Sequence, residues 1–224
     1  MAATLQLSTD DLLTTTRSVR RRLDLERPVE REVLLECLRI AQQAPTGNGV
    51  PWCHFVIVTD PEKRAGLAHL FRRAVDIYRD LPYSAYNIKV PDPELQARMP
   101  HISSSLESLY EHLQEVPVHL LACLNFRLTG EESVKGEGPF LAATFAGSVY
   151  PACWSFMLAA RSRGLASCLT TLHLLFEEEV ARLLDIPYDR VTQEALIPVA
   201  YARGTDFKPA YRSPLEGILH WNSW

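Results

Sequence analysis

The sequence lacks the short motifs that identify several large enzyme classes. Its 224 residues contain no H-E-x-x-H metal motif, no G-x-S-x-G nucleophile motif and no Walker A phosphate loop. Two glycine pairs, at 47–49 and 136–138, stop before the third glycine of a dinucleotide-binding fingerprint, which disfavours a Rossmann fold. The seven histidines are scattered. We therefore expect no metal site and no catalytic constellation of side chains.

Paired cysteines and an excess of positive charge are also missing. The cysteines, at 37, 53, 123, 153 and 168, are widely spaced in apolar surroundings and form no C-x-x-C. This pattern argues against a zinc or thioredoxin-type site and favours reduced, buried thiols in a cytoplasmic protein. The net charge of −4 gives no general attraction to nucleic acid or to an anionic membrane, so neither is expected as a partner.

Charge is absent altogether between Glu137 and Arg161. A span of about 20 apolar residues can cross a bilayer, but proline, glycine, serine and tyrosine interrupt this one and leucine is scarce. We therefore predict a helix buried in a core or at a subunit interface, not a membrane anchor. Near the N-terminus, Asp10 and Asp11 stand where a secretion signal needs its apolar core, so no signal peptide is expected.

Hydrophobic patterns predict helices that alternate with short apolar strands. The predicted helices begin after an N-cap at Ser8 or Thr9 and then cover 28–44, 61–79, 103–115, 138–160 and 176–185. The predicted strands cover 53–59, 118–124, 165–171 and 194–202. Neither a linker nor an internal repeat divides the chain. Residues 1–224 are therefore predicted to form a single mixed α/β, or α+β, domain around a sheet of about four or five strands.

Three segments fall outside this alternation. Residues 80–102 contain four prolines and two tyrosines, which indicates an irregular excursion long enough to act as a lid. A polar stretch at 129–138 is expected to be a mobile loop. The tail at 207–224 carries Trp221 and Trp224, which must pack on another part of the protein or on a partner.

The stretch A-P-T-G-N-G-V-P-W at 44–52 crowds turn-forming residues in front of the strand at 53–59. Such a stretch offers rigid backbone with few side chains, where a flat or anionic ligand can approach closely. A structural elbow between a helix and a strand explains the same residues equally well. Both interpretations stay open at this point.

The basic segment R-S-V-R-R-R at 17–22 also allows two interpretations. Its arginines can form a solvated cluster paired with Asp24, Glu26 and Glu30. Alternatively they can form a phosphate clamp, because guanidinium groups match phosphate oxygens in a bidentate fashion and Ser18 can add a hydrogen bond. The segment is too short for a nucleic-acid surface.

Taken in order, six motifs of the chain resemble those of the FMN-dependent nitroreductase family. They are R-S-V-R at 17–20, A-P-T-G-N-G-V-P-W at 44–52, L-A-A…G-L-A at 158–166, L-D-I-P at 184–187, P-V-A-Y at 198–201 and R-S-P-L-E at 212–216. The chain departs from the family pattern at Thr16, where a basic residue is frequent, at Val50, where Gln is usual, and at Ala166, where Gly is usual. The turn at 44–52 is also one residue shorter.

The resemblance implies an architecture and a set of FMN contacts. The implied fold has a mostly antiparallel central sheet flanked by helices and a domain-swapped arm at 207–224, with FMN bound between the subunits of a homodimer. By this resemblance, the phosphate is held by Arg17, Ser18 and Arg212, and the N1–C2=O edge faces Arg20. Flavin N5 meets the backbone of Thr170, Thr171 and Leu172, and the ring lies against Pro45, Thr46 and Asn48. Arg21 is the alternative to Arg20.

The resemblance also implies an activity. A family member of this kind takes a hydride from NADH or NADPH onto flavin N5 and passes it to a small electron-poor acceptor, such as a nitroaromatic or a quinone. Two alternatives remain. One is a specialised member of the superfamily, dehalogenase-like or flavin-fragmenting. The other is a protein that binds or stores flavin with little turnover. The sequence itself indicates neither the acceptor nor the preferred nicotinamide.

Overall fold

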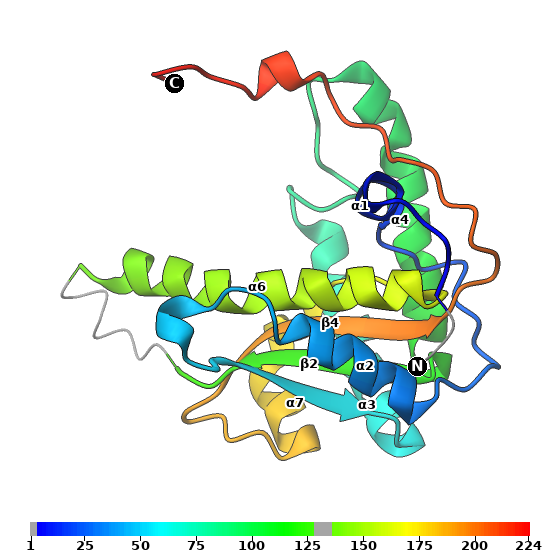
Figure 1. The fold of residues 1–224 in the computed structure, drawn as a ribbon, viewed down its shortest axis with the longest axis vertical. Helices are drawn as coiled ribbons and strands as arrows, with labels where there is room; N and C mark the ends of the chain where they lie inside the picture. The colour runs from blue at the N-terminus through cyan, green and yellow to red at the C-terminus, as the bar shows by residue number, and fades with distance from the viewer. Residues whose placement is uncertain (1–3, 128–135) are drawn as a thin grey trace.

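A four-stranded antiparallel sheet forms the centre of the computed structural model, which describes residues 4–127 and 136–224 (Figure 1). The strands follow the order β1-β2-β4-β3, and each neighbouring pair is antiparallel. Their bounds are Cys53–Val58 for β1, Val118–Leu124 for β2, Leu165–Ser167 for β3 and Thr192–Tyr201 for β4. The predicted fold class, including the antiparallel sheet flanked by helices, is confirmed.

The central strand β2 explains why both faces of the sheet are covered. Its sequence, VHLLACL, is apolar at six of seven positions, and every one of its residues is buried. Leu120 lies opposite Ile57 on one side and Ile197 on the other. A strand without the polar alternation of a half-exposed sheet has to be buried on both faces.

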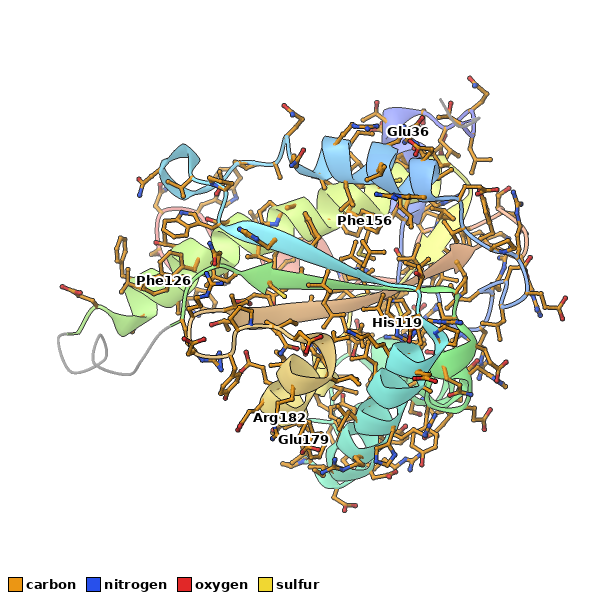
Figure 2. All side chains as sticks on the ribbon, turned by 90° about the horizontal axis from the view of Figure 1, so that it is seen from below. Glu36, His119, Phe126, Phe156, Glu179 and Arg182 are labelled. Carbon is orange, nitrogen blue, oxygen red and sulfur yellow. The ribbon has the colours of Figure 1, made fainter. Side chains whose placement is uncertain are left out.

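Helices supply that cover on each side (Figure 2). On one face lie α2 (Arg31–Ala41) and α6 (Gly138–Ser162), which pack around Phe156. On the other lie α3 (Pro61–Asp80) and α7 (Glu177–Leu184), which enclose a second apolar cluster that includes Leu67 and Phe71. The sheet is thus the middle of three layers.

The helix starts follow from capping residues in the sequence. Ser8 caps α1 (Thr9–Thr15) by accepting a hydrogen bond from the Asp11 backbone N–H at 3.0 Å. Asp60 caps α3 in the same way, and Asp92 caps α4 (Pro93–His112). In both of these helices a proline occupies the first helical position, where its missing N–H costs nothing.

The cap at Asp92 corrects one prediction. The sequence analysis placed an irregular excursion at 80–102 and a helix at 103–115, whereas α4 already begins at Pro93 and ends at His112. Pro100 lies inside α4 and removes one helical donor without ending the helix. The irregular part is therefore confined to 81–92, and a lid role for this region stays a prediction.

The other strands and helices match their predicted ranges with shifts at the ends. The largest shift concerns the strand predicted at 165–171, because β3 already ends at Ser167. Beyond it, Thr170 pairs with Leu196 through an isolated bridge. Short 3₁₀ helices lie at Gly47–Gly49, Leu113–Glu115, Leu172–Phe176 and Leu215–Gly217. Most of the loop predicted at 129–138 lies outside the described residues.

The charge-free helix α6 is covered on one side only. It is long and apolar enough to cross a membrane by length and composition, and 39% of its most apolar window is buried. The predicted core helix is confirmed for the face that carries Val149, Cys153 and Phe156. The opposite face exposes Phe140, Gly147 and Trp154, spaced at seven residues.

The C-terminal arm, residues 207–224, leaves the sheet after β4 and runs past α4 to the far end of the molecule (Figure 1). Its last part is apolar yet exposed, at Leu215, Ile218, Leu219, Trp221 and Trp224. Apart from the Trp224 ring, which stacks on His220, these side chains show no ring contact with the described residues and stay exposed, so the packing that the sequence analysis expected of the tail is not seen there. A swap of the arm onto a second copy stays a prediction.

The buried imidazole of His173 makes the fold sensitive to acid. His173 is fully buried, and neither ring nitrogen has a hydrogen-bond partner among the described residues. Burial lowers the pKa of His173 from 6.5 to about 3. Because the folded pKa lies below the unfolded one, the unfolded chain binds a proton first. His173 therefore leaves stability intact above pH 6.5 and diminishes it as the pH falls toward 3.

We predict that His173→Leu flattens this loss. Between pH 6 and pH 4 the free energy of unfolding of the wild type should fall by about 1.4 kcal/mol per pH unit more than that of the variant. The reason is that the variant takes up one proton fewer when it unfolds. Urea unfolding at a series of pH values measures the difference. His54→Leu, at an exposed position of β1, is the control. The same acid sensitivity in His173→Leu and wild type would contradict the assignment.

Candidate functional site

Three segments that are distant in the sequence meet beside α1: residues 17–21, α4 and the first half of the arm (Figure 1). The Val19 backbone N–H donates to the Ser167 carbonyl at 2.9 Å, which fixes the first segment to the end of β3. An Arg17 Nη1 donates to the carbonyl of Lys208 in the arm at 3.2 Å. The site is thus built around the edge strand β3.

Two arginines connect the first segment to α4. Arg20 Nη1 donates to Ser105 Oγ at 3.1 Å, and Arg21 Nη2 donates to Ser104 Oγ at 2.7 Å. The Ser105 hydroxyl itself donates to the Ile102 carbonyl at 2.7 Å, so its lone pairs face Arg20. Sequence reasoning missed these serines, and the only signal for them was the run S-S-S at 103–105.

Unpaired positive charge gathers at this place. In the part of the chain that the structure describes, four guanidinium groups of the site have no carboxylate within ion-pair distance, those of Arg17, Arg20, Arg21 and Arg212. Their neighbour Arg22 differs, because it pairs with Asp206 at 2.5 Å. Cations that are concentrated and not neutralised within the chain favour an anionic ligand.

The pairing of 17–22 with Asp24, Glu26 and Glu30, which one of the two interpretations expected, does not occur in the described residues, although Arg17 and Arg21 are solvent-exposed. Glu30 accepts a hydrogen bond from the Tyr201 hydroxyl at 2.6 Å instead. Asp24 accepts from the backbone N–H groups of Glu26 and Arg27. These acids stabilise the turn that follows the basic segment, so they leave its arginines free for another partner.

Arg20 is the better of the two candidates for contact with a flavin ring. It is half-buried, whereas Arg21 is exposed. Its Nε is buried and has no hydrogen-bond partner in the described residues. Arg20 also lies beside Cys168, where burial raises the thiol pKa to about 11 and the guanidinium only partly offsets that rise. Cys168 is therefore a neutral thiol, not a nucleophile, at neutral pH.

The backbone after β3 offers one unused donor. The Thr170 N–H is committed to the Leu196 carbonyl at 2.9 Å, and the Leu172 N–H points to Thr170 Oγ1 at 3.4 Å. The Thr171 N–H donates no hydrogen bond to any described residue, and Thr171 is exposed. Within the predicted trio, Thr171 is the one whose backbone can serve a ligand.

The remaining site residues of this region are accessible. Ser18 and Arg212 are both exposed, and Arg212 Nη1 donates only to the carbonyl of its neighbour Tyr211, at 2.8 Å. The structure thus brings the predicted residues Arg17, Ser18 and Arg20 together beside the end of β3, with Thr171 shortly after that strand. Arg212 lies nearer the start of α4, where its neighbours Tyr211 and Ser213 bind Asp92, about 18 Å of helix away from Ser104. No group of three or more His, Cys, Asp or Glu that could hold a metal occurs in the described residues.

The turn at 45–49 is held rigidly, but it lies away from the arginines at 17–21. The Gly47 N–H donates to Ser148 Oγ at 2.9 Å, and Trp52 Nε1 donates to the Gly47 carbonyl at 3.1 Å. Asn48 and Gly49 have φ of 58° and 69°, a left-handed geometry that favours these two residue types. Pro45 and Asn48 are exposed, and Thr46 is half-buried. The rigid, side-chain-poor backbone that the sequence predicts is present.

The turn contacts the middle of α6, whereas the arginine region lies near the C-terminal end of that helix (Figure 1). The turn binds Ser148, whereas at the C-terminal end the Ser162 carbonyl accepts from the Leu5 N–H. Ser148 and Ser162 are about 21 Å apart along the helix at 1.5 Å per residue. One chain therefore does not bring Pro45, Thr46 and Asn48 to the other predicted flavin-binding residues.

The sequence profile of the nitroreductase family matches residues 13–201. The chain belongs to the nitroreductase family. The match begins just before the basic segment and ends with β4, so it spans the sheet and most of the candidate site. No curated protein matches the chain.

Solved structures share the fold of this nitroreductase-family chain at low sequence identity. Iodotyrosine deiodinase bound to FMN and 3-iodo-L-tyrosine has 22% identity and a TM-score of 0.68, over 96% of this chain and 99% of that one. A BluB-like flavoprotein from Clostridium difficile 630 has 18% identity and a TM-score of 0.69, over 97% and 100%. A mutant of the FMN- and NADPH-dependent nitroreductase NfnB, from Sphigopyxis sp. strain HMH, has 21% identity and a TM-score of 0.65, over 97% and 100%.

We predict that Ser148→Ala loosens the turn. The buried hydroxyl is the only acceptor for the Gly47 N–H among the described residues, so its loss should cost about 1 kcal/mol of unfolding free energy. Amide exchange at Gly47 should become faster. Ser155→Ala, on the same helix but with no side-chain hydrogen bond in the described structure, is the control. Unchanged exchange at Gly47 would show that Ser148 does not hold the turn.

Proposed function

We propose that the chain is an FMN-dependent oxidoreductase that takes a hydride from NAD(P)H and delivers it to a small electron-poor acceptor, such as a nitroaromatic or a quinone. The observation that carries this proposal is the set of unpaired guanidinium groups around residues 17–21 and Arg212. A family member with such a region has a natural use for it, because FMN carries both a phosphate and a ring that becomes negative when reduced.

The residues present fit FMN. Arg17, Ser18 and Arg212 are accessible and would hold the phosphate by charge-assisted hydrogen bonds. Arg20 is half-buried beside the Cys168 thiol and has no carboxylate within ion-pair distance in the described residues, so its charge is available to a ring that becomes negative. The Thr171 N–H would point to flavin N5, where a fixed donor orients the atom that receives the hydride. When bound, FMN would supply the hydride chemistry itself.

The protein's part in this chemistry is electrostatic. Ser105 holds Arg20 in place, and the half-buried setting raises the effect of its charge relative to water. At the N1–C2=O edge, this guanidinium would stabilise the negative charge of reduced flavin. In this role Arg20 acts as a fixed positive charge that neither gives nor takes a proton. A general acid or base is not part of the proposal.

We further propose a homodimer whose two sites are each completed by both copies. Three features support this arrangement: the uncovered apolar face of α6, the exposed apolar end of the arm, and the separation of the turn at 45–49 from the arginine region. In a two-fold dimer the same patch is used twice. The turn of one copy would then lie beside the arginine region of the other, with the α6 faces between them.

Titration with FMN tests the proposed cofactor. The wild type should bind FMN, and Arg17→Ala should weaken binding roughly ten- to a hundredfold, the effect of one hydrogen bond to a charged group. Arg39→Ala, at an exposed position of α2, is the control. Anaerobic addition of NADH or NADPH should then bleach the flavin absorbance, and an acceptor should restore it.

The outcomes separate the alternatives. A chain that binds FMN yet is bleached by neither nicotinamide would contradict the oxidoreductase and favour flavin storage. Bleaching without transfer to nitroaromatics or quinones would instead favour a specialised member, a class to which iodotyrosine deiodinase and the BluB-like flavoprotein point by fold. A chain that does not bind FMN would overturn the proposal.

Mixing of variants tests the shared site. Arg17→Ala damages the arginine region, and Gly49→Val damages the turn because a β-branched residue resists a φ of 69°. Each homodimer should bind FMN weakly. Refolding the two together should restore about a quarter of the wild-type sites, since half of the dimers are mixed and each of those has one intact site. A mixture of Arg17→Ala and Arg212→Ala should restore none. Equal behaviour of the two mixtures would contradict the shared site.

A further inference from the structure

Both neighbours of Arg212 are bound to the same oxygen atom of Asp92. The Tyr211 hydroxyl donates to Asp92 Oδ2 at 2.7 Å, and the Ser213 hydroxyl donates to it at 2.5 Å. The other oxygen, Oδ1, accepts from the backbone N–H groups of Glu94 and Leu95 and so caps α4. One carboxylate thus ends a helix with one oxygen and holds the arm with the other.

A second contact fixes the same point of the arm. The Arg98 guanidinium lies over the Tyr211 ring, 4.9 Å from its centroid. Arg98 is itself paired with Glu94, one turn earlier on α4, at 2.7 Å. Tyr211 is therefore held through its hydroxyl and its ring, both by the first two turns of α4.

The arm has few other fixed points. At its start, the Phe207 ring lies between the guanidinium groups of Arg22 and Arg161, at 4.4 and 4.8 Å from its centroid. From Leu215 onward its apolar side chains are exposed. Between Phe207 and Pro214 the described arm has neither a helix nor a strand. The contact with Asp92 is accordingly what determines where residues 211–213 lie.

The geometry also keeps Arg212 free of Asp92. Two side chains two positions apart that reach one oxygen lie on the same side of the backbone, so the residue between them faces the other way. Arg212 accordingly forms no ion pair with Asp92, although it is flanked by both of that residue's partners. Its guanidinium stays available while its backbone is held.

We propose that Asp92 is a positioning residue that sets Arg212 for the phosphate of FMN and so couples the start of α4 to cofactor binding. This inference rests on the proposed function. The two hydroxyl donors, Ser213 foremost, lower the pKa of Asp92 to about 2, so the carboxylate stays charged over the range in which the protein would work. Coupling is reciprocal, so a bound phosphate should in turn order the first turns of α4.

Asp92→Asn is the variant that tests the proposal. Asparagine is as good an N-cap as aspartate, so α4 should stay intact with the single amide oxygen as its cap. The amide nitrogen that then faces the arm has no negative charge and cannot accept hydrogen bonds from the Tyr211 and Ser213 hydroxyls. The chain offers a matched control, because α3 and α4 both begin with D-P-E. Asp60→Asn alters the cap of α3, whose carboxylate accepts from the Lys63 N–H and has no contact with the described arm.

The expected result is a loss of affinity that depends on the phosphate. Asp92→Asn should weaken FMN binding about tenfold, as for one charged hydrogen bond, whereas Asp60→Asn should leave it unchanged. Riboflavin, which has the same ring and no phosphate, should bind both variants as it binds the wild type. In an Arg212→Ala background, Asp92→Asn should cause no further loss of FMN affinity.

Other results would overturn the inference. Equal weakening of FMN and riboflavin would give Asp92 a structural role only, and so would additive losses in the double variant. If Asp92→Asn does not fold, Tyr211→Phe combined with Ser213→Ala removes both donors, leaves the cap in place and must show the same phosphate-dependent loss. FMN binding by the wild type with no loss in these variants would overturn this inference alone. A wild type that binds neither flavin would overturn the proposed function as well.

Discussion

A helix of 25 residues that carries no charge until its last turn has to be covered on all sides, and the rest of the architecture depends on how α6 meets that constraint. The sheet and α2 cover one face, which gives the chain one of its two apolar clusters, the one around Phe156. The other face, with Phe140 and Trp154, stays exposed in one chain. Burying about 800 Å² per partner suffices for a standard interface. A second copy on this face is the simplest cover, because it needs no other partner.

The same helix separates the two halves of the candidate site. Its length keeps the turn at 45–49 away from the arginines at 17–21, and both halves are rigid where they stand. In the proposed dimer, a ligand that needs both the arginines and the bare backbone of the turn would be served by two chains. The packing requirement of α6 and the completeness of the site point to the same assembly. The proposed dimer is therefore supported both by the exposed apolar face of α6 and by the separation of the turn from the arginines.

Local signals in the sequence predicted the fold well. The apolar run V-H-L-L-A-C-L marked the central strand to the residue, and the cap at Ser8 marked the start of α1. The start of α4 was missed because the prolines at 91, 93 and 100 were interpreted as breakers, although a proline just after a capping aspartate begins a helix. The site was harder to predict. The motif arginines could be named, but which acids they would pair with is set by tertiary contacts that link positions far apart, such as Arg22 with Asp206.

The two D-P-E sequences show that residues with the same local signal for a helix start can differ in their tertiary contacts. Asp60 and Asp92 begin helices by the same mechanism, and each caps with its Oδ1. They differ in what reaches the second oxygen. At Asp92 the arm supplies Tyr211 and Ser213 from the far end of the chain, and these residues flank the arginine of R-S-P-L-E. A capping residue has one oxygen to spare, and at α4 that oxygen ties the helix to the segment that would hold the cofactor's phosphate. The start of α4 and the arm therefore share one carboxylate, which is a direct route by which the state of one can affect the other.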